Sequence, residues 1–253
     1  MNMFDLTGKV ALVTGGAHSI GFSLGVGLAQ AGAKVCFCCT SEGSRQRGLA
    51  AYAEAGVDAH GYVANVTDEA AVQAMVARIR EEVGIIDILV NNAGIIKRIP
   101  MCDMSVEDFA QVIDVDLIAP YNIMRLAAWA MAQNEPVTED GERGVIINTS
   151  SIAAEHGQKG QQSYSAAKGA LNSMALPVAR GLARNGIRCV GIMPGLFLTP
   201  IYKSQERVDA MMDYTVFPKR FGRPDEFASL ALEIVRNSML NGMTIRLDGA
   251  VRF

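Results

Sequence analysis

Short apolar runs alternate with longer segments of helical period along most of the chain. The first run, at 9–14, is continuous rather than alternating, which is typical of a strand buried on both faces. Small and apolar residues then recur at helical spacing over 19–31, and Gly32 follows as a stop signal. The same pattern predicts further strands at 34–40, 58–66, 87–90, 144–148, 187–193 and 244–247, and further helices at 44–55, 69–83, 105–133, 164–180 and 224–235.

This alternation predicts a fold of the α/β class. Strands separated by helices form parallel sheets with right-handed crossovers, so we expect a doubly wound, seven-stranded parallel sheet of the Rossmann type with helices on both faces. Pro120 should kink or divide the helical region at 105–133. The segment 196–222 has no clear period, and a loop of that length is typical of a functional lid. No repeat or linker is visible, so one domain should cover residues 1–253.

Composition and charge exclude several classes of function. The net charge is −3, which does not favour nucleic acid or an anionic membrane surface as a partner. No apolar run approaches the roughly 18 residues of a membrane span, and residues 1–9 carry no basic-then-apolar targeting signal. The five cysteines have no paired spacing, so we expect reduced thiols and a cytoplasmic protein.

Three of these cysteines cluster in the second predicted strand. Cys36, Cys38 and Cys39 could in principle hold a metal, but no second Cys or His pair stands at zinc-ligand spacing. Alternate residues of a strand also face opposite sides of the sheet. We therefore predict buried strand cysteines and no metal site.

A glycine-rich turn joins the first strand to the first helix. Gly15, Gly16 and Gly21 lie in this turn, where glycine lets the backbone approach a pyrophosphate. The helix that follows adds free amides and a partial positive charge. The position of the turn, after the first strand and before the first helix, indicates a dinucleotide site.

A second constellation carries acid–base chemistry. Tyr164 and Lys168 lie four residues apart in a predicted helix, hence on one face and one turn from each other. A lysine ammonium beside a phenol favours the phenolate, so Tyr164 is a candidate to donate or accept a proton at neutral pH. Ser151 follows the strand at 144–148, at the carboxyl edge where open parallel sheets bind ligands. Tyr–Lys pairs of this spacing are also common on solvated helix surfaces.

Together these motifs resemble the classical short-chain dehydrogenases/reductases over essentially the whole chain. The resemblance is carried by the turn at 14–21, by Asn91-Asn92-Ala93-Gly94, by Ser151, Tyr164 and Lys168, and by Pro194-Gly195 followed by Thr199. It implies that Tyr164 is the general acid and base, that Ser151 orients the substrate oxygen, and that Lys168 holds the nicotinamide ribose. The cofactor contacts that it implies are Gly15, His18, Ser19, Ile20, Gly21, Thr40, Ser41, Asn65, Val66, Asn92, Ala93, Gly94, Tyr164, Lys168, Pro194, Gly195 and Thr199.

Three positions depart from the family pattern. Ser19 replaces the middle glycine of the turn, where its side chain could crowd or hydrogen-bond the pyrophosphate. Asp116 stands where the family has a catalytic asparagine that supports a proton relay, and gluconate 5-dehydrogenases share this aspartate. Cys39, followed by Thr40, ends the second strand where NAD-preferring members have an acid that binds the ribose 2′-hydroxyl.

The missing acid decides the cofactor prediction. Without a carboxylate at Cys39, nothing repels a 2′-phosphate, and the surrounding residues resemble NADPH-using 3-oxoacyl-acyl-carrier-protein reductases. We predict NADP(H) as the preferred cofactor, with NAD(H) possible. Arg45 and Arg47 could assist, or could be plain surface charges at the start of a helix.

The substrate motifs point in two directions. Residues 91–100 resemble gluconate 5-dehydrogenases, in which case Lys97 and Arg98 could meet a sugar-acid carboxylate, although adjacent basic residues are more often solvated. The C-terminal half resembles type 2 3-hydroxyacyl-CoA dehydrogenases, and this likeness implies substrate contacts at Gln158, Gln161 and Leu196. The lid holds Ile201, Tyr202, Val208, Met211, Met212, Tyr214, Val216 and Phe217, an apolar lining that favours an acyl chain or ring over a polyol.

The leading hypothesis is therefore reversible reduction of a 3-oxoacyl thioester or a similar apolar ketone. A sugar-acid oxidoreductase is the alternative, and the mixed resemblance also allows a recombined chain. A non-catalytic NAD(P)-binding sensor or scaffold on the same fold is the hypothesis from another class. The family resemblance further implies a homotetramer, with interfaces on the helices at 105–133 and 164–180.

Overall fold

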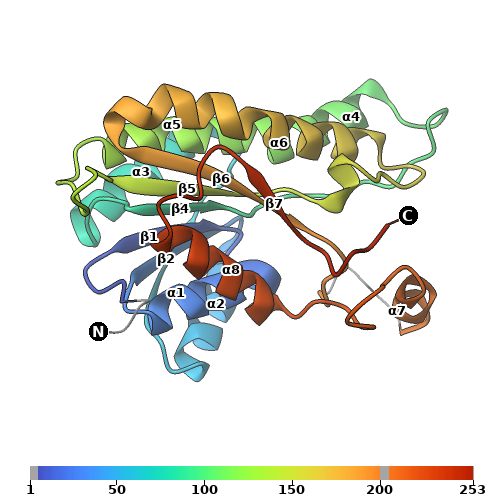
Figure 1. The fold of residues 1–253 in the computed structure, drawn as a ribbon, viewed down its shortest axis with the longest axis horizontal. Helices are drawn as coiled ribbons and strands as arrows, with labels where there is room; N and C mark the ends of the chain where they lie inside the picture. The colour runs from blue at the N-terminus through green and yellow to red at the C-terminus, as the bar shows by residue number, and fades with distance from the viewer. Residues whose placement is uncertain (1–4, 200–204, 253) are drawn as a thin grey trace.

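The computed structural model describes residues 5–199 and 205–252 and is built around one parallel sheet (Figure 1). Its strands are β1 (Val10–Thr14), β2 (Lys34–Cys39), β3 (Ala59–Val63), β4 (Ile88–Asn91), β5 (Gly144–Thr149), β6 (Ile187–Pro194) and β7 (Thr244–Leu247). They are ordered β3-β2-β1-β4-β5-β6-β7, and every neighbouring pair is parallel. The strand order reverses between β1 and β4, and this confirms the predicted seven-stranded, doubly wound sheet.

Helices cover both faces of this sheet (Figure 1). They are α1 (Ser19–Gln30), α2 (Glu42–Glu54), α3 (Glu69–Glu82), α4 (Val106–Ile113), α5 (Ala119–Met131), α6 (Gln162–Leu182), α7 (Gln205–Met212) and α8 (Pro224–Arg236). Helices α1, α2 and α8 lie on one side of the sheet and α3, α5 and α6 on the other. No helix among the described residues is long and apolar enough to cross a membrane.

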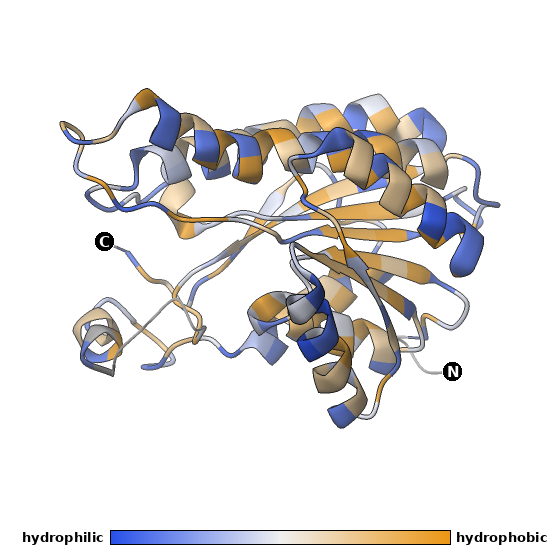
Figure 2. Ribbon diagram, turned by 180° about the vertical axis from the view of Figure 1, so that it is seen from behind, coloured by the Kyte–Doolittle hydropathy of each residue, from blue (hydrophilic) through white to orange (hydrophobic). Residues whose placement is uncertain are grey.

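The continuous apolar strands are explained by two cores. Leu12 packs into the core under α3, α5 and α6, whereas its neighbours Ala11 and Val13 pack into the core under α1 and α8. Successive residues of a strand face opposite sides, so a sheet covered on both faces needs apolar residues at every position. Figure 2 shows this concentration of hydrophobic residues on the strands and on the inner helix faces. Cys36 and Cys38 belong to the first of these cores.

Side-chain caps set several helix starts. The Asp68 carboxylate accepts a hydrogen bond from the amide of Ala71 at 3.1 Å, as its place before α3 predicts. Ser41 caps α2 in the same way, through the amide of Ser44 at 3.3 Å. Because of this cap, α2 begins at Glu42, two residues before the predicted start.

The helical region predicted at 105–133 is divided into two α-helices. A π-helix, η1 (Asp114–Ile118), separates α4 from α5. Pro120, in the first turn of α5, has no amide hydrogen for the carbonyl of Asp116, so regular α-helical bonding cannot continue through this point. The wider turn places Asp116 in the interior, where it is completely buried.

The lid at 196–222 differs from its prediction as a structureless loop, because it contains the two-turn helix α7. Its two ends are joined by hydrogen bonds from Leu198 N to Gly222 O (2.9 Å) and from Gly222 N to Leu196 O (2.8 Å). A helix of eight residues is too short to show a clear period in the sequence. Ile201 and Tyr202 of the predicted lid lining lie outside the described residues.

Candidate active site

A cleft of about 560 Å³ opens at the carboxyl edge of the sheet, where β1, β4, β5 and β6 end. It lies at the reversal of strand order, the place where open α/β sheets bind ligands. The predicted site residues that line it are His18, Ser19, Ile20, Gly21, Asn92, Gly94, Asp116, Ser151, Gln158, Gln161, Tyr164, Lys168, Pro194, Gly195, Leu196 and Thr199. Segments far apart in the sequence therefore meet in one cavity.

The glycine turn is closely packed against the end of β4. Gly21 has no room for a side chain, because a Cβ would lie 2.4 Å from Gly15 O and 2.6 Å from the Asn92 amide nitrogen. Gly15 adopts φ +64°, a left-handed conformation in which glycine is favoured. The Thr14 hydroxyl accepts hydrogen bonds from the amides of Asn92 (2.9 Å) and Ala93 (3.0 Å). These bonds join the end of β1 to the loop that follows β4.

This turn fits a dinucleotide. The absence of side chains at Gly15 and Gly21 lets the turn pack closely against the end of β4, and α1 begins beside the cleft with free N-terminal amides that suit a pyrophosphate. Ser19, the first residue of α1, also has a left-handed backbone, at φ +58°. A serine therefore occupies a backbone conformation that favours glycine, and it lines the cleft.

The acid–base residues come from two neighbouring elements. Ser151 follows β5 and caps a short 3-10 turn, η2 (Ile152–Ala154), where its Oγ accepts from the amide of Ala153 at 3.1 Å. Tyr164 and Lys168 project from the first turns of α6, and the lysine Nζ lies 5.5 Å from the centre of the tyrosine ring. All three line the cleft, so the predicted hydroxyl, phenol and ammonium share one cavity.

Lys168 is fixed from two sides. Its Nζ donates to the carbonyl of Thr149 at 3.0 Å and forms an ion pair with Asp116 Oδ2 at 3.1 Å. The Ser150 hydroxyl also donates to the Lys168 carbonyl at 3.1 Å. Both Thr149 and Ser150 were missed by the sequence analysis: Thr149 acts through its backbone carbonyl, which leaves no residue-type signal, and the Ser150 hydroxyl contacts only the backbone of Lys168.

The Asp116–Lys168 pair is almost completely buried. Burial raises the pKa of Asp116, and the Lys168 charge opposes this rise. Burial also acts to lower the pKa of Lys168, but the attraction of Asp116 and Tyr164 outweighs it, so the lysine pKa is raised. Asp116 is fixed in turn by the amide of Ile95, which donates to its Oδ1 at 2.7 Å. The aspartate therefore holds the ammonium beside the phenol.

The substrate side of the cleft joins three loops. Gln161 is buried and its side chain accepts from the amide of Gln158 at 2.9 Å. The side-chain oxygen of Gln158, Oε1, accepts from Arg98 Nη1 at 2.7 Å, and its side-chain nitrogen, Nε2, lies 4.0 Å from the sulfur of Met211 in α7. The two predicted glutamines are thus brought together, with Arg98 and the lid helix beside them.

The remaining predicted cofactor residues lie outside the cleft lining. Gly15 and Ala93 pack against each other behind it, at 3.1 Å from the ideal Cβ of Gly15 to Ala93 Cα. Thr40 and Ser41 follow β2, and Asn65 and Val66 follow β3, at the same carboxyl edge but beyond β1. Their contact with a cofactor stays a prediction.

Comparisons with known proteins agree with this geometry. A family model described as short chain dehydrogenase matches residues 9–209. The chain is 43% identical over 256 residues to the 3-hydroxyacyl-CoA dehydrogenase type-2 of Mus musculus, with 98% of this chain and 97% of the relative covered. It is 34% identical over 258 residues to the 2-dehydro-3-deoxy-D-gluconate 5-dehydrogenase of Formosa agariphila, covering 99% and 95%.

A solved structure is similar along the same length. It is a 7α-hydroxysteroid dehydrogenase complexed with NADH and 7-oxo glycochenodeoxycholic acid, which has a TM-score of 0.89, is 28% identical, and is matched over 98% of this chain and 96% of that one. Family model, relatives and fold therefore indicate one family. The chain belongs to the short-chain dehydrogenases/reductases, a family of nicotinamide-dependent oxidoreductases.

Proposed function

We propose that the protein transfers a hydride between NADP(H) and a secondary alcohol or ketone, and that its best ketone is a 3-oxoacyl thioester or a similar apolar compound. The observation that carries the proposal is the meeting of Ser151, Tyr164 and Lys168 in the cleft that also holds the glycine turn. A non-catalytic binding protein would not need a hydroxyl, a phenol and an ammonium in this arrangement.

In the direction of reduction, the Tyr164 hydroxyl donates its proton to the substrate oxygen, and the Ser151 hydroxyl donates a hydrogen bond to that same oxygen. The bound cofactor supplies the hydride. Lys168, held by Thr149 and Asp116, stabilises the negative charge that remains on the phenol. Positioning and fixed charges of this kind supply most of the acceleration in such sites.

The end of β2 supports a preference for NADP(H). The Cys39 thiol is turned toward the carbonyls of Ser41 and Tyr62, at 3.5 and 3.8 Å, and brings no negative charge. The next carboxylate, Glu42, is paired with Arg45 at 2.5 Å. A 2′-phosphate would therefore meet little repulsion here. Michaelis constants for NADPH and NADH test this, and a lower value for NADH would contradict it.

Side chains around the reacting groups support an apolar substrate. Ile95, Ile96, Ile152, Leu196, Phe197 and Met211 line the cleft. The mouse relative is named for a 3-hydroxyacyl-CoA substrate, and it is the more similar of the two relatives described above. A sugar-acid oxidoreductase remains the second candidate, because the other relative is named for a deoxygluconate and Arg98 lines the cleft.

Replacement of the phenol tests the reaction class. Tyr164→Phe removes the proton donor without changing packing, so turnover should fall by at least about two orders of magnitude, while NADPH still binds. Tyr121→Phe is the control, because Tyr121 is half exposed on α5 and is absent from the cleft lining. Absorbance assays with acetoacetyl-CoA, a steroid ketone and 5-ketogluconate measure turnover. Full activity of Tyr164→Phe would refute the assignment.

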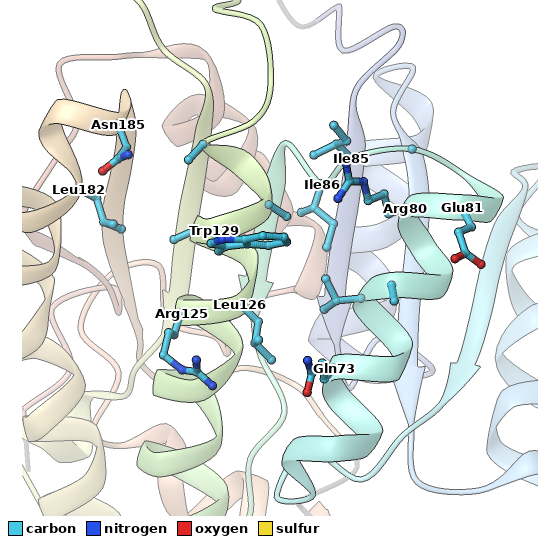
Figure 3. A pocket seen from close by; sticks show the side chains of 16 residues that line it. Gln73, Arg80, Glu81, Ile85, Ile86, Arg125, Leu126, Trp129, Leu182 and Asn185 are labelled. Carbon is cyan, nitrogen blue, oxygen red and sulfur yellow. The ribbon is translucent and has the colours of Figure 1, made fainter.

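We also propose a homotetramer in the cytoplasm. Apolar side chains are exposed on α4 (Val106 and Phe109), at the end of η1 (Ile118), on α5 (Tyr121 and Trp129) and on α6 (Leu176). A groove of about 980 Å³ runs between α3 and α5, and Figure 3 shows Trp129 projecting across it from α5. Apolar exposure of this extent favours a protein partner. All five cysteines are unpaired, in keeping with a reducing compartment.

A further inference from the structure

Arg246 of the edge strand β7 joins two segments that border the cleft. Its strand neighbours Ile245 and Leu247 pack toward α1 and α8, so the Arg246 side chain points to the opposite face of the sheet. There its Nη1 donates to the Glu155 carboxylate, while Nε and Nη2 donate to Asp248 Oδ2 at 3.0 and 2.5 Å. One guanidinium therefore bridges two carboxylates that are far apart in the sequence.

Glu155 ends the short turn η2 that follows Ser151. The amide of Ala154 donates to the Ser151 carbonyl at 2.9 Å, and the amide of Glu155 donates to the Ile152 carbonyl at 3.0 Å. A 3-10 turn of three residues has weak internal hydrogen bonds, so its orientation depends on contacts outside it. The ion pair with Arg246 supplies such a contact at the end of the turn.

Asp248 begins the C-terminal tail that follows β7. Its carboxylate also pairs with Arg252 at 3.0 Å. Val251 of the same tail is buried in a small apolar cluster, which we call the lid core. The lid core comprises Ile152, Met193, Leu196, Val208, Phe221 and Val251. Val208 belongs to the lid helix α7 and Ile152 to η2, so the tail, the lid and the Ser151 turn meet in one cluster.

The contacts of Arg246 lie on the substrate side of the site. Ile152 and Leu196 of the lid core line the cleft together with Ser151. The glycine turn is held by different contacts, which run from Thr14 to the loop after β4. A change at Arg246 should therefore affect the ketone and leave the binding of the cofactor unaltered.

We propose that Arg246 is a positioning residue for the reaction, and that it holds the Ser151 turn through Glu155 and the base of the lid through Asp248. The Ser151 hydroxyl must meet the substrate oxygen while the lid covers the substrate, so both parts have to be fixed at the same time. The inference rests on the proposed function and adds a residue that is absent from the cleft lining.

Partial exposure should make this arrangement sensitive to salt. The Glu155 side chain is 50% exposed and that of Arg246 is 22% exposed, so dissolved ions can screen their attraction. The screening length falls from about 10 Å at 0.1 M ionic strength to about 3 Å at 1 M. The side chain of Asp248 is more buried and is screened less. Rising salt should therefore loosen the Ser151 turn first.

Glu155→Gln is the test variant, because it removes the exposed carboxylate and leaves Arg246 paired with Asp248. Turnover of acetoacetyl-N-acetylcysteamine, a neutral ketone, is measured from about 0.05 to about 1 M NaCl. Fluorescence titration gives the Kd for NADPH, and mass spectrometry follows hydrogen exchange of the amides at 151–156. Glu69→Gln is the matched control, since Glu69 is 67% exposed, pairs with Arg125 and is absent from the cleft lining.

In the unmodified protein, kcat and kcat/KM should fall together by about two- to fivefold as salt rises. Glu155→Gln should begin at the lower values, respond little to salt and show faster exchange at 151–156, while the Kd for NADPH stays within about twofold. Arg246→Gln releases both carboxylates and should reduce kcat further, on the order of tenfold. Arg246→Lys should recover part of this loss, and Glu69→Gln should behave as the unmodified protein.

A Glu155→Gln protein with unchanged kcat and salt response would overturn the positioning role and leave the proposed dehydrogenase intact. Faster exchange at 151–156 without a loss of kcat would overturn it as well, because the ion pair would then only stabilise the turn. An unmodified protein that binds NADPH but reduces neither this ketone, a steroid ketone nor 5-ketogluconate would instead overturn the proposed function, and the positioning role with it.

Discussion

Asp116 is the residue at which the site departs most from the family pattern in charge. It lies within η1, is completely buried and pairs with Lys168. The carboxylate holds the ammonium, and its negative charge also offsets the positive charge that Lys168 brings to the cleft. One residue therefore both positions the lysine and weakens its electrostatic effect.

Replacement by the uncharged isostere should separate these two effects. Asp116→Asn removes the negative charge and keeps an oxygen for the Ile95 amide, so alcohol oxidation, which needs the phenolate, should reach half its maximum at lower pH. We expect a shift on the order of one pH unit. The pH dependence of kcat for oxidation measures it.

Asp114→Asn is the control, since Asp114 lies in the same π-helix but is exposed. Burial raises the pKa of Asp116, and the charge of Lys168 opposes this rise. An unchanged profile in Asp116→Asn would mean that this carboxyl is already protonated wherever the enzyme is active, and would contradict the expected repulsion.

Ser19 gives a second prediction at the scale of single residues. Its φ of +58° costs an L-residue about 1–2 kcal/mol, whereas glycine adopts it freely and loses about 0.5–1 kcal/mol through the entropy of the unfolded chain. Ser19→Gly should therefore stabilise the protein by up to about 1 kcal/mol and raise Tm by about 2–4 °C. Ser23→Gly, in the regular part of α1, should lower Tm instead. An equal decrease of Tm in the two variants would show that the Ser19 backbone is not strained.

At the scale of elements, Arg188 of β6 joins three parts of the fold. Its guanidinium donates to the carbonyls of Ile234 (2.8 Å), Val235 (2.9 Å) and Leu240 (2.9 Å) and makes a two-point contact with Glu142. The carbonyls of Ile234 and Val235 belong to the last turn of α8, where backbone acceptors have no partner inside the helix. Arg188 therefore fastens the end of α8 to the sheet.

A pair of matched glutamate changes tests this role. Glu142→Gln leaves the buried Arg188 charge without its counter-charge and should lower the free energy of unfolding by about 3 kcal/mol. Glu42→Gln breaks a similar two-point contact with Arg45 on the surface, where solvent screens the charges, and should lower the free energy of unfolding much less. Urea unfolding measures both values. A similar decrease in the free energy of unfolding for both variants would show that burial of the Arg188–Glu142 pair does not add to stability.

At the scale of the whole molecule, both faces of the sheet are covered, but the outer face of α4 and α5 is rich in apolar side chains. Trp129 is 68% exposed beside the groove against α3. A surface of this kind is stable in water when a second copy covers it. The proposed homotetramer would bury it.

Charge placed on this face should break the assembly. Trp129→Glu should reduce the mass measured by light scattering from four chains to fewer, because burial of an unpaired carboxylate is costly. Val63→Glu is the control, since Val63 is an exposed apolar residue on the edge strand β3, away from α5. A tetramer that survives Trp129→Glu would exclude this face as an interface.

The sequence by itself determined the strands, most of the helices and the one-turn spacing of Tyr164 and Lys168. These features follow from local rules: apolar runs bury on both faces of a sheet, Asp68 caps a helix, and residues four apart share a helix face. The glycine turn could also be predicted from the sequence, because it is recognised by its place between the first strand and the first helix.

Only the tertiary structure decided which distant residues meet. Asp116 pairs with Lys168 because Pro120 forces a π turn between α4 and α5, and Arg98 reaches Gln158, 60 residues away, because two loops close over the sheet edge. The short helix α7 was also beyond prediction, because two turns show no period. Such contacts depend on how whole elements pack, and no local pattern in the sequence encodes that packing.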